Sequence, residues 1–278
     1  MTKVPALIAQ GTAQLGSAAE ARTLLAYAAG LERGRLAMVD DLPAATIEDY
    51  RSLLQRRSTG IPVQYLTGRA AFRTVEVAVA PGVFIPRPET EVMTGWAIER
   101  LQRITAPVVV ELCAGSGAIS LAIATETTGV RQYAVELSET AAKTAADNLS
   151  GTGVDLRVGD MADAFPELNG QVDLVIANPP YIPLEAWEGV SAEVRAHEPA
   201  LALFSGADGL DALRVVAAVA ARLLRPGAVV CAEHAESQSE AVTALFAGTG
   251  WYHSVVDHQD LTDRPRFVSG VRAQSLAG

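Results

Sequence analysis

The stretch VVVELCAGSGAIS, residues 108–120, combines three signals that together indicate a fold class. Its run of branched apolar residues predicts a buried strand, which ends at Glu111 and Leu112. Gly115 and Gly117 follow, where a backbone without a Cβ can pass close to a ligand. The residues from Ala118 onward predict a helix. A strand, a glycine-rich turn and a helix in this order are typical of a Rossmann-like α/β domain.

The same alternation extends outward from this stretch, from residue 90 to the C-terminus. Strands are predicted at 106–112, 131–136, 154–158, 172–177, 227–233, 251–257 and 266–272. Helices are predicted at 90–104, 118–125, 138–149 and 210–224. Such alternation favours a largely parallel, doubly wound sheet that binds ligands at the carboxyl ends of its strands.

The chain before residue 90 follows a different pattern. Short helices are predicted at 17–30 and 46–57, since each segment begins at Ser17 or Thr46 with an acidic residue three positions later. The segment TVEVAVAPGVFI, residues 74–85, alternates around a Pro-Gly turn and predicts a β-hairpin. We therefore expect a helical domain at 1–73, a hairpin linker at 74–89 and the Rossmann-like domain at 90–278.

Composition limits the class of protein. A length of 278 residues, with 49% hydrophobic and 19% charged residues, indicates a folded globular chain. No apolar run is long enough to span a membrane, and the N-terminus lacks a signal-peptide pattern. Cys113 and Cys231 allow at most one disulfide, so we expect reduced thiols and a cytoplasmic location. The four histidines show no metal-ligand spacing, so no metal site is expected.

Charge is distributed unevenly along the chain. Residues 1–83 hold 9 Lys and Arg against 7 Asp and Glu, a balance of +2. Residues 84–278 hold 13 against 25, a balance of −12. Because an acidic body does not attract phosphate backbones, DNA is not expected as a partner.

Two arginine positions allow more than one interpretation. Arg56 and Arg57 are predicted to lie on a solvated helix face, with contact to a partner as the alternative. Arg87 stands between two prolines. It is a candidate cation of a pocket, and it is equally a candidate partner for Glu89 or Glu91 at the start of a helix.

The glycine-rich turn predicts an adenosine-containing ligand. Glu136 ends the next strand, where a carboxylate can accept hydrogen bonds from two ribose hydroxyls. A dinucleotide-binding oxidoreductase uses similar geometry, but it prefers a G-x-G-x-x-G turn, and Glu111 in front of this turn would repel phosphate. A carboxylate suits the cationic amino group of a methionine moiety, which favours S-adenosylmethionine. After the third strand, Asp160 is a candidate to bind the adenine amino group and Met161 is a candidate to pack on the ring. Taken in isolation, a loop acid and a core methionine are the commoner interpretation of these two residues.

The stretch VDLVIANPPYIP, residues 172–183, predicts a second group of ligand contacts. Asn178 adds a side-chain carbonyl and Tyr181 a flat aromatic face. Pro179 and Pro180 have no N–H, and their own carbonyls stay free to accept hydrogen bonds. Acceptors beside a ring suit a planar NH2 group. An isolated Asn-Pro-Pro is as typical of a purely structural turn as of a ligand-binding loop. The rest of the chain therefore has to distinguish these two interpretations.

These motifs together resemble a known group of enzymes. The class I S-adenosylmethionine-dependent methyltransferases that act on planar amino groups share ELCAGSG (111–117), Glu136, Gly159-Asp160 and NPPY (178–181). Two families compete, namely the adenine-N6 DNA methyltransferases and the PrmC/HemK protein-glutamine N5-methyltransferases of peptide chain release factors. No target-recognition domain for DNA is visible. The flanks resemble PrmC/HemK landmarks: PVQYLTG (62–68), FIPRPETE (84–91), EPALAL (198–203), GADGLD (206–211), AEHAE (232–236) and DLTDRPR (260–266).

The PrmC/HemK resemblance implies a substrate and a set of binding residues. It implies that the helical domain helps to grip a class 1 release factor, and that the glutamine of the factor's Gly-Gly-Gln motif is methylated, with S-adenosylhomocysteine as product. It assigns the cofactor to Cys113, Ala114, Gly115, Ser116, Gly117, Glu136, Met161 and Asn178, which join Glu111 and Asp160. It assigns the glutamine pocket to Phe84, Asn178, Pro179, Pro180 and Tyr181, with Asn178, Pro179 and Tyr181 as catalytic residues.

Some positions depart from the family pattern. Glu111 stands where Asp is commoner, and Met161 stands where the residue can be aromatic. Cys113 stands where Gly is frequent, so its backbone is expected to have a negative φ. Ala200 and Ala235 replace the more usual Arg and Gly. None of these positions lies in NPPY, so they bear on ligand contacts more than on the chemistry.

Overall fold

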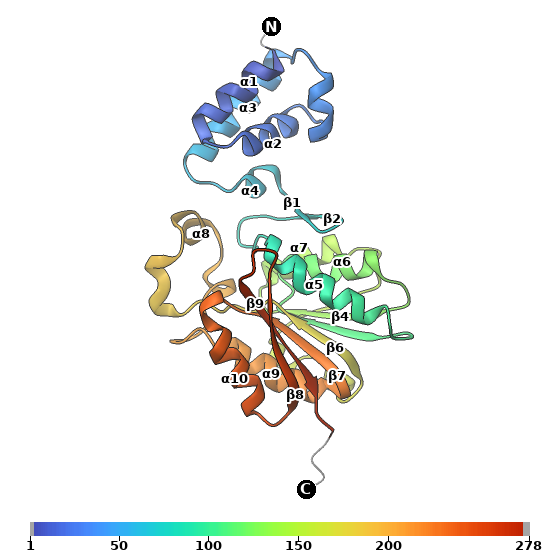
Figure 1. Cartoon of the computed structure of the whole chain (residues 1–278). Coiled ribbons are helices and arrows are strands. Elements are labelled where there is room, and N and C mark those ends of the chain that lie inside the picture. Colours follow the sequence, from blue (N-terminus) through green and yellow to red (C-terminus); the bar gives the residue numbers. More distant parts are fainter. Residues whose placement is uncertain (1–2, 275–278) are drawn as a thin grey trace. The chain divides into compact units, whose positions relative to one another are not determined.

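The computed structural model describes residues 3–274 and divides the chain into two compact units (Figure 1). The first, here called the helical unit, comprises the chain up to Arg69 together with Ser191–His197. The second, here called the sheet unit, comprises Ala70–Val190 and the chain from Glu198 onward. The chain therefore leaves the sheet unit after Val190 and returns to it at Glu198.

The helical unit is built from short helices around an aliphatic core. Ser17 caps its second helix as predicted, since its Oγ accepts a hydrogen bond from the Glu20 backbone N–H at 3.3 Å. The third helix begins before Thr46, with Pro43 at its N-cap position, so Thr46 is not the cap that the sequence suggested. The elements are α1 (Val4–Leu15), α2 (Ala18–Ala28), the 3₁₀ helix η1 (Arg33–Met38), α3 (Ala44–Ser58), α4 (Val63–Thr67) and α8 (Ala192–His197).

The hairpin lies earlier in the chain than the sequence predicted. Strands β1 (Arg69–Phe72) and β2 (Val75–Ala78) form a two-stranded sheet, and Pro81-Gly82 lies beyond them. The turn contains Arg73 with a φ of 52°. The Arg73 guanidinium pairs with Glu126 at 2.6 Å and donates to the Glu91 carbonyl oxygen at 3.0 Å. Tertiary contacts thus stabilise a turn that contains neither glycine nor proline.

The sheet unit contains a seven-stranded sheet of order β5-β4-β3-β6-β7-β9-β8. The first five strands in this order run parallel to one another, and β9 is antiparallel to both β7 and β8. The prediction of a largely parallel sheet is confirmed. The strands are β3 (Val108–Leu112), β4 (Arg131–Glu136), β5 (Asp155–Val158), β6 (Val172–Ala177), β7 (Leu224–Glu233), β8 (Tyr252–Gln259) and β9 (Pro265–Arg272).

Helices cover both faces of this sheet. Figure 1 shows α5, α6 and α7 on one face and α9 and α10 on the other. Alternate residues of β3, Val108, Val110 and Leu112, belong to the same core cluster as Leu213 and Val216 of α9. The sequence assigned no helix to α10. The helices are α5 (Pro88–Leu101), α6 (Ala118–Glu126), α7 (Glu139–Asn148), α9 (Asp211–Leu223) and α10 (Ser239–Gly248), with 3₁₀ turns η2 (Met161–Asp163), η3 (Pro166–Leu168), η4 (Leu184–Gly189), η5 (Ala200–Ala202) and η6 (Glu236–Gln238).

The strand order reverses at β3, and this places the ligand-binding edge. Leu112 of β3 pairs with Val135 of β4 on one side and with Ala177 of β6 on the other. The residues that follow these strands therefore meet at one edge, where open α/β sheets bind ligands. Within residues 3–274, no helix is long and apolar enough to cross a bilayer.

Candidate active site

A cavity of about 190 Å³ opens at this edge of the sheet unit. Its walls come from the turn after β3, the end of β4, the turn after β5 and the NPPY loop after β6. The end of the linker forms a further wall, and the segment that precedes α9 forms another. All but one of the predicted site residues line the cavity: Phe84, Glu111, Cys113, Ala114, Gly115, Ser116, Glu136, Asp160, Met161, Asn178, Pro179, Pro180 and Tyr181.

The two glycines of the turn after β3 have different surroundings. Gly115 has a φ of 55°, and a Cβ added to it would meet no atom within 4 Å. Its backbone therefore faces open space in the cavity. Gly117 does not line the cavity, and a Cβ there would lie 3.2 Å from Leu149 side-chain atoms. Gly117 allows α6 to pack closely against the end of α7, while Gly115 leaves room for a ligand.

The backbone φ angle of Cys113 differs from the one that the sequence predicted. The absence of glycine predicted a negative φ, but the structure has a φ of 61°. The left-handed conformation costs a non-glycine residue about 1–2 kcal/mol, so neighbouring contacts must offset it. The Ala114 N–H donates to the Val135 carbonyl oxygen at 3.0 Å, which holds the turn against β4. The Cys113 Sγ lies 3.5 Å from the Met161 Sδ, so the two sulfur atoms pack together at the cavity.

Glu111 is a buried acidic residue that lines the cavity. Its side chain is 2% exposed, and its Oε2 accepts hydrogen bonds from both the backbone N–H, at 3.0 Å, and the hydroxyl of Ser120. Burial raises the pKa of Glu111 to about 8, although the hydrogen bonds from Ser120 oppose that shift. A cationic ligand beside Glu111 would favour its ionised form.

Glu136 holds the glycine-rich turn in place. Its Oε2 accepts from the Gly115 N–H at 2.7 Å, and its Oε1 accepts from the Ser138 N–H at 2.8 Å. Each carboxylate oxygen has two lone pairs, so both oxygens can also accept from a ligand hydroxyl. Nearby, the Asp160 Oδ1 accepts from the Ala162 N–H at 2.9 Å and caps the short turn that carries Met161.

Hydrogen bonds to two other segments of the sheet unit hold the NPPY loop and the residue after it in place. The Tyr181 carbonyl oxygen accepts a hydrogen bond from the Gln238 Nε2 at 2.8 Å. The Ile182 N–H donates to the Leu203 carbonyl oxygen at 2.8 Å, and the Ser205 N–H donates to the Ile182 carbonyl oxygen at 2.9 Å. Backbone pairing thus joins the loop to the segment before α9.

A chain of hydrogen bonds through the buried side chains of Thr90 and Glu233 connects the two ends of the NPPY motif. The Asn178 Nδ2 donates to the Thr90 Oγ1 at 3.1 Å, and the Thr90 hydroxyl donates to the Glu233 Oε2 at 2.6 Å. The Tyr181 hydroxyl donates to the other oxygen, Glu233 Oε1, at 3.1 Å. The sequence did not select Thr90 or Glu233, although both lie in the quoted stretches FIPRPETE and AEHAE. We refer to these four side chains as the Glu233 network.

Burial governs the electrostatics of the Glu233 network. Glu233 is 1% exposed, and burial raises its pKa to about 7, against the effect of its hydrogen bonds from Thr90 and Tyr181. Burial also raises the pKa of the Tyr181 phenol, with the Glu233 charge as the next cause. Tyr181 therefore stays a neutral donor near neutral pH.

Arg87 contacts neither of the acids that the sequence proposed for it. Its guanidinium forms an ion pair with the buried carboxylate of Glu198, and it lies over the Phe84 ring at 4.8 Å from the centroid. Phe84 lines the cavity on one side, and Pro199, next to Glu198, lines it on another. This ion pair joins two walls of the cavity.

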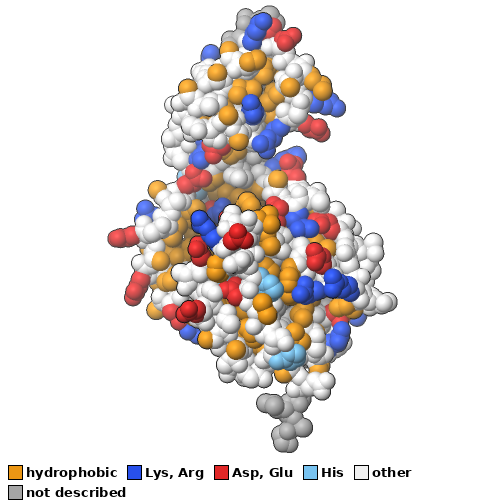
Figure 2. Space-filling view, in the orientation of Figure 1, with side chains coloured by type: hydrophobic (Ala, Val, Ile, Leu, Met, Phe, Trp, Pro, Cys, Tyr) orange, Lys and Arg blue, Asp and Glu red, His pale blue; other side chains and the backbone are white. Residues whose placement is uncertain are grey.

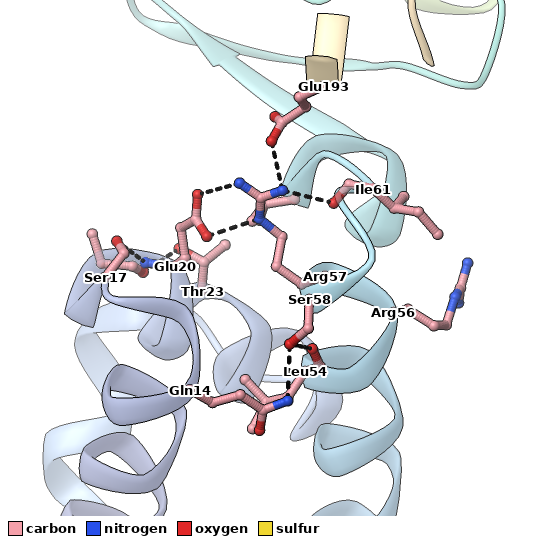
Figure 3. A network of polar contacts seen from close by, with 12 residues as sticks. Gln14, Ser17, Glu20, Thr23, Leu54, Arg56, Arg57, Ser58, Ile61 and Glu193 are labelled. Carbon is pink, nitrogen blue, oxygen red and sulfur yellow. Dashed lines mark hydrogen bonds and ion pairs between the residues drawn. The ribbon is translucent and has the colours of Figure 1, made fainter. Parts of the chain in front are cut away.

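Arg57 is not on a solvated helix face. Its side chain is 16% exposed and forms a bidentate pair with Glu20, with the Nε–Oε2 and Nη2–Oε1 atoms 2.8 and 3.0 Å apart. Its Nη1 also donates to the Glu193 Oε2 at 2.7 Å and to the Ile61 carbonyl oxygen at 3.2 Å (Figure 3). Arg57 thus binds the segment 191–197 to the rest of the helical unit, whereas Arg56 is exposed.

Charged groups are intermixed on the visible surface. On the face shown in Figure 2, acidic and basic side chains stand among hydrophobic ones over the sheet unit. Leu201, which lines the cavity, is 54% exposed, so the mouth of the cavity has an apolar component.

Comparison with known proteins places the chain among methyltransferases. Residues 6–68 match the PrmC N-terminal domain, and residues 74–193 match the methyltransferase small domain. A release factor glutamine methyltransferase of Streptomyces coelicolor is 48% identical over 281 residues, covering 98% of this chain and 99% of that protein. The chain belongs to the release factor glutamine methyltransferase family. A second member of this family, from Mycolicibacterium smegmatis, is 41% identical over 98% of this chain and 99% of its own length.

Two further proteins match a smaller share of the chain. The 4-amino-L-phenylalanine/4-methylamino-L-phenylalanine methyltransferase of Streptomyces pristinaespiralis is 45% identical over 207 residues, 72% of this chain and 70% of that protein. Among solved structures, the release factor-specific protein-(glutamine-N5) methyltransferase of Alicyclobacillus acidocaldarius is 29% identical. The match covers 70% of the present chain and 99% of the Alicyclobacillus chain, with a TM-score of 0.45.

Proposed function

We propose that this member of the release factor glutamine methyltransferase family transfers a methyl group from S-adenosylmethionine to the side-chain amide nitrogen of a glutamine in a class 1 release factor. The observation that carries the proposal is the orientation of Asn178 at the cavity. Its Nδ2 donates to Thr90, so its Oδ1 is the end left to accept a hydrogen bond from a substrate NH2 group.

The polar groups that line the cavity and the open space beside Gly115 support the proposed cofactor. Gly115 leaves open space where a side chain would otherwise stand, which suits the close approach of a ligand to the backbone. Glu111 can balance a cationic amino group, and Glu136 has lone pairs for hydroxyl groups. Asp160 and Met161 line the same cavity, where an adenine amino group and ring would find an acceptor and an apolar surface. When bound, S-adenosylmethionine would supply an electrophilic methyl group.

The protein's own residues would position and polarise the amide. A glutamine nitrogen is a poor nucleophile, because its lone pair is delocalised into the carbonyl. In this proposal the Asn178 Oδ1 and the Pro179 carbonyl oxygen accept the two N–H bonds, which favours positive charge on the nitrogen. Acceptors aligned in advance can contribute ~3 kcal/mol each. Tyr181 and Phe84 would hold the amide plane and exclude water, which adds the benefit of orientation.

No general base is needed in this scheme. An amide nitrogen that has gained a methyl group is strongly acidic, so it loses its extra proton to water without assistance. The burial that raises the pKa of Tyr181 suits this scheme, because the tyrosine then serves as a neutral wall and donor rather than as a base.

The helical unit belongs to the proposal as the part that helps to grip the release factor. Its match to the PrmC N-terminal domain supports this role. The acidic balance of residues 84–278 disfavours DNA, the substrate of the adenine-N6 alternative. The relative that methylates an aromatic amine gives a second candidate, a small aromatic amine, but its match covers 72% of the chain against 98% for the release factor enzyme.

The test is methyl transfer from labelled S-adenosylmethionine with four acceptors offered in parallel. They are a release factor, the same factor with its Gly-Gly-Gln glutamine changed to alanine, unmethylated DNA, and 4-amino-phenylalanine. Label on the intact factor alone is expected. Label on the alanine variant would place the modification elsewhere, and label on DNA or the free amino acid alone would overturn the proposal in favour of that substrate.

A further inference from the structure

The Glu233 network connects parts of the chain that are far apart in sequence. Thr90 lies on α5, Asn178 and Tyr181 lie on the loop after β6, and Glu233 ends β7. The carboxylate is buried, yet each of its oxygens accepts one hydroxyl hydrogen bond within the network. None of the contacts described for the cofactor requires Glu233, so its position calls for another explanation.

The chemistry of the carboxylate decides the direction of every bond in the network. An ionised carboxylate only accepts hydrogen bonds. The Thr90 and Tyr181 hydroxyls must therefore both donate to Glu233. Because the Thr90 proton is committed to Glu233, its oxygen must accept from Asn178, and Asn178 must present its NH2 group to Thr90. The other end of the amide, the oxygen, is then left for the cavity.

We propose that Glu233 is a positioning residue for methyl transfer, which fixes Asn178 with its amide oxygen toward the substrate and fixes the Tyr181 ring beside it. This inference rests on the proposed function, because it assigns the oxygen of Asn178 to the substrate amide. Glu233 acts through Thr90 and Tyr181 and does not itself touch the reacting atoms. An asparagine without this constraint could present its NH2 group instead, which would repel the NH2 group of a glutamine.

The charge on Glu233 makes the arrangement sensitive to pH. Protonation places an O–H donor on one oxygen of Glu233 and weakens that oxygen as an acceptor, which disturbs the pattern in which both oxygens accept from hydroxyls. Burial raises the pKa of Glu233 to about 7. Arg266 of β9 lowers this pKa and Glu89 of α5 raises it, while His234, the next residue, faces Asp257 with its Nε2 3.3 Å from Oδ1. The protein is expected to lose turnover as the pH falls through about 7.

The experiment compares Glu233→Gln with wild type and with Glu236→Gln, which removes an exposed acid in the same segment. We expect Glu233→Gln to lower kcat about 10- to 100-fold, to change the KM for the cofactor less than threefold, and to abolish the acid limb of the kcat profile near pH 7. Glu233→Asp should recover part of kcat together with the acid limb. Glu236→Gln should keep wild-type kcat and the wild-type profile.

A double-mutant cycle separates positioning from a general effect on folding. If Glu233 acts through Tyr181, the double variant Glu233→Gln with Tyr181→Phe should lose less kcat than the product of the two single losses. Thermal unfolding midpoints and cofactor binding report on folding independently of turnover. Wild-type kcat and an unchanged acid limb in Glu233→Gln would overturn the inference. Failure of the wild-type protein to methylate the release factor would instead overturn the proposed function.

Discussion

Asn178 is the side chain closest to the proposed chemistry, and its orientation depends on residues distant in sequence. Thr90, which accepts a hydrogen bond from the Asn178 NH2 group, lies 88 positions away from Asn178, and Glu233 lies 143 positions from Thr90. The motif NPPY predicted Asn178, Pro179 and Tyr181 as site residues, because these residues lie within one four-residue stretch of the chain. Thr90 and Glu233 gave no local signal, since a threonine in a first helical turn and an acid at a strand end are both common. Only the folded sheet brings them together.

Replacement of Asn178 by alanine removes the proposed acceptor without altering the backbone of the loop. Asn178→Ala is expected to lower kcat about 100-fold or more, because an acceptor aligned with the reacting amide contributes ~3 kcal/mol. Cofactor binding should change only a few-fold. Single-turnover methyl transfer and equilibrium cofactor titration check the two quantities. Asn169→Ala, at an exposed asparagine before β6, is the control, and turnover near wild type in Asn178→Ala would contradict the role.

Glu111 gives a prediction about stability and pH. Its pKa is about 8 in the folded protein, above the ordinary value of 4.5. Between these values the folded state holds a proton that the unfolded state has released, so the free energy of unfolding falls as pH rises from 4.5 through 8. Both hydrogen bonds from Ser120 go to one oxygen, so a glutamine can accept them as well.

Glu111→Gln is therefore expected to gain stability relative to wild type as pH rises. The gain should be small at pH 5 and should reach a few kcal/mol at pH 8.5, since each unit of pKa shift corresponds to about 1.4 kcal/mol. Urea unfolding of both proteins at pH 5, 7 and 8.5, without cofactor, measures it. Parallel stability curves for the two proteins would show that Glu111 titrates normally.

At the level of elements, predictions succeeded where the local pattern carries the information. Strands β4 and β6 have the bounds that the sequence predicted, and α2 begins after the cap expected from Ser17. The hairpin was misplaced because Pro81-Gly82 gave a stronger local turn signal than Arg73. The Arg73 turn depends on contacts with α5 and α6, which no window of sequence contains.

Asn148 of α7 connects the hairpin to the glycine-rich turn. Its Nδ2 donates to the carbonyl oxygens of Ser116 and Ala78 at 2.8 and 3.0 Å, and its Oδ1 accepts from the Ala78 N–H at 2.8 Å. Asn148→Ala is expected to cost about 1–2 kcal/mol of stability and to raise the KM for the cofactor several-fold, because Ser116 lines the cavity. Asp147→Ala, exposed on the same helix, is the matched control. An unchanged cofactor KM would show that the turn holds its shape without Asn148.

At the scale of the whole molecule, the helical unit includes a segment from the second half of the chain. Residues 191–197 lie between the NPPY loop and the cavity-lining segment at Pro199, yet they belong to the helical unit. Arg57 contacts this segment through Glu193 (Figure 3). The sequence could not reveal this contact, because Arg57 and Glu193 are 136 positions apart.

Removal of the Arg57 side chain should loosen this segment. Arg57→Ala is expected to speed amide hydrogen exchange in 191–197 about tenfold, which corresponds to about 1.4 kcal/mol of local stability. The KM for the release factor should rise, while the KM for the cofactor should stay near wild type. Arg56→Ala, its exposed neighbour, should change none of these quantities. Equal exchange in both variants would indicate that other contacts hold the segment.

The assignment of residues 191–197 to the helical unit also affects how domains can be exchanged between related proteins. The chain crosses the boundary between the two units three times, whereas a simple fusion of two modules would cross it once. A chimaera that exchanges only the N-terminal residues would bring in helices that lack the α8 sequence with which they pair. The part that can be exchanged is therefore discontinuous in sequence. A working chimaera has to replace α8 together with the N-terminal helices, although α8 lies in the second half of the chain.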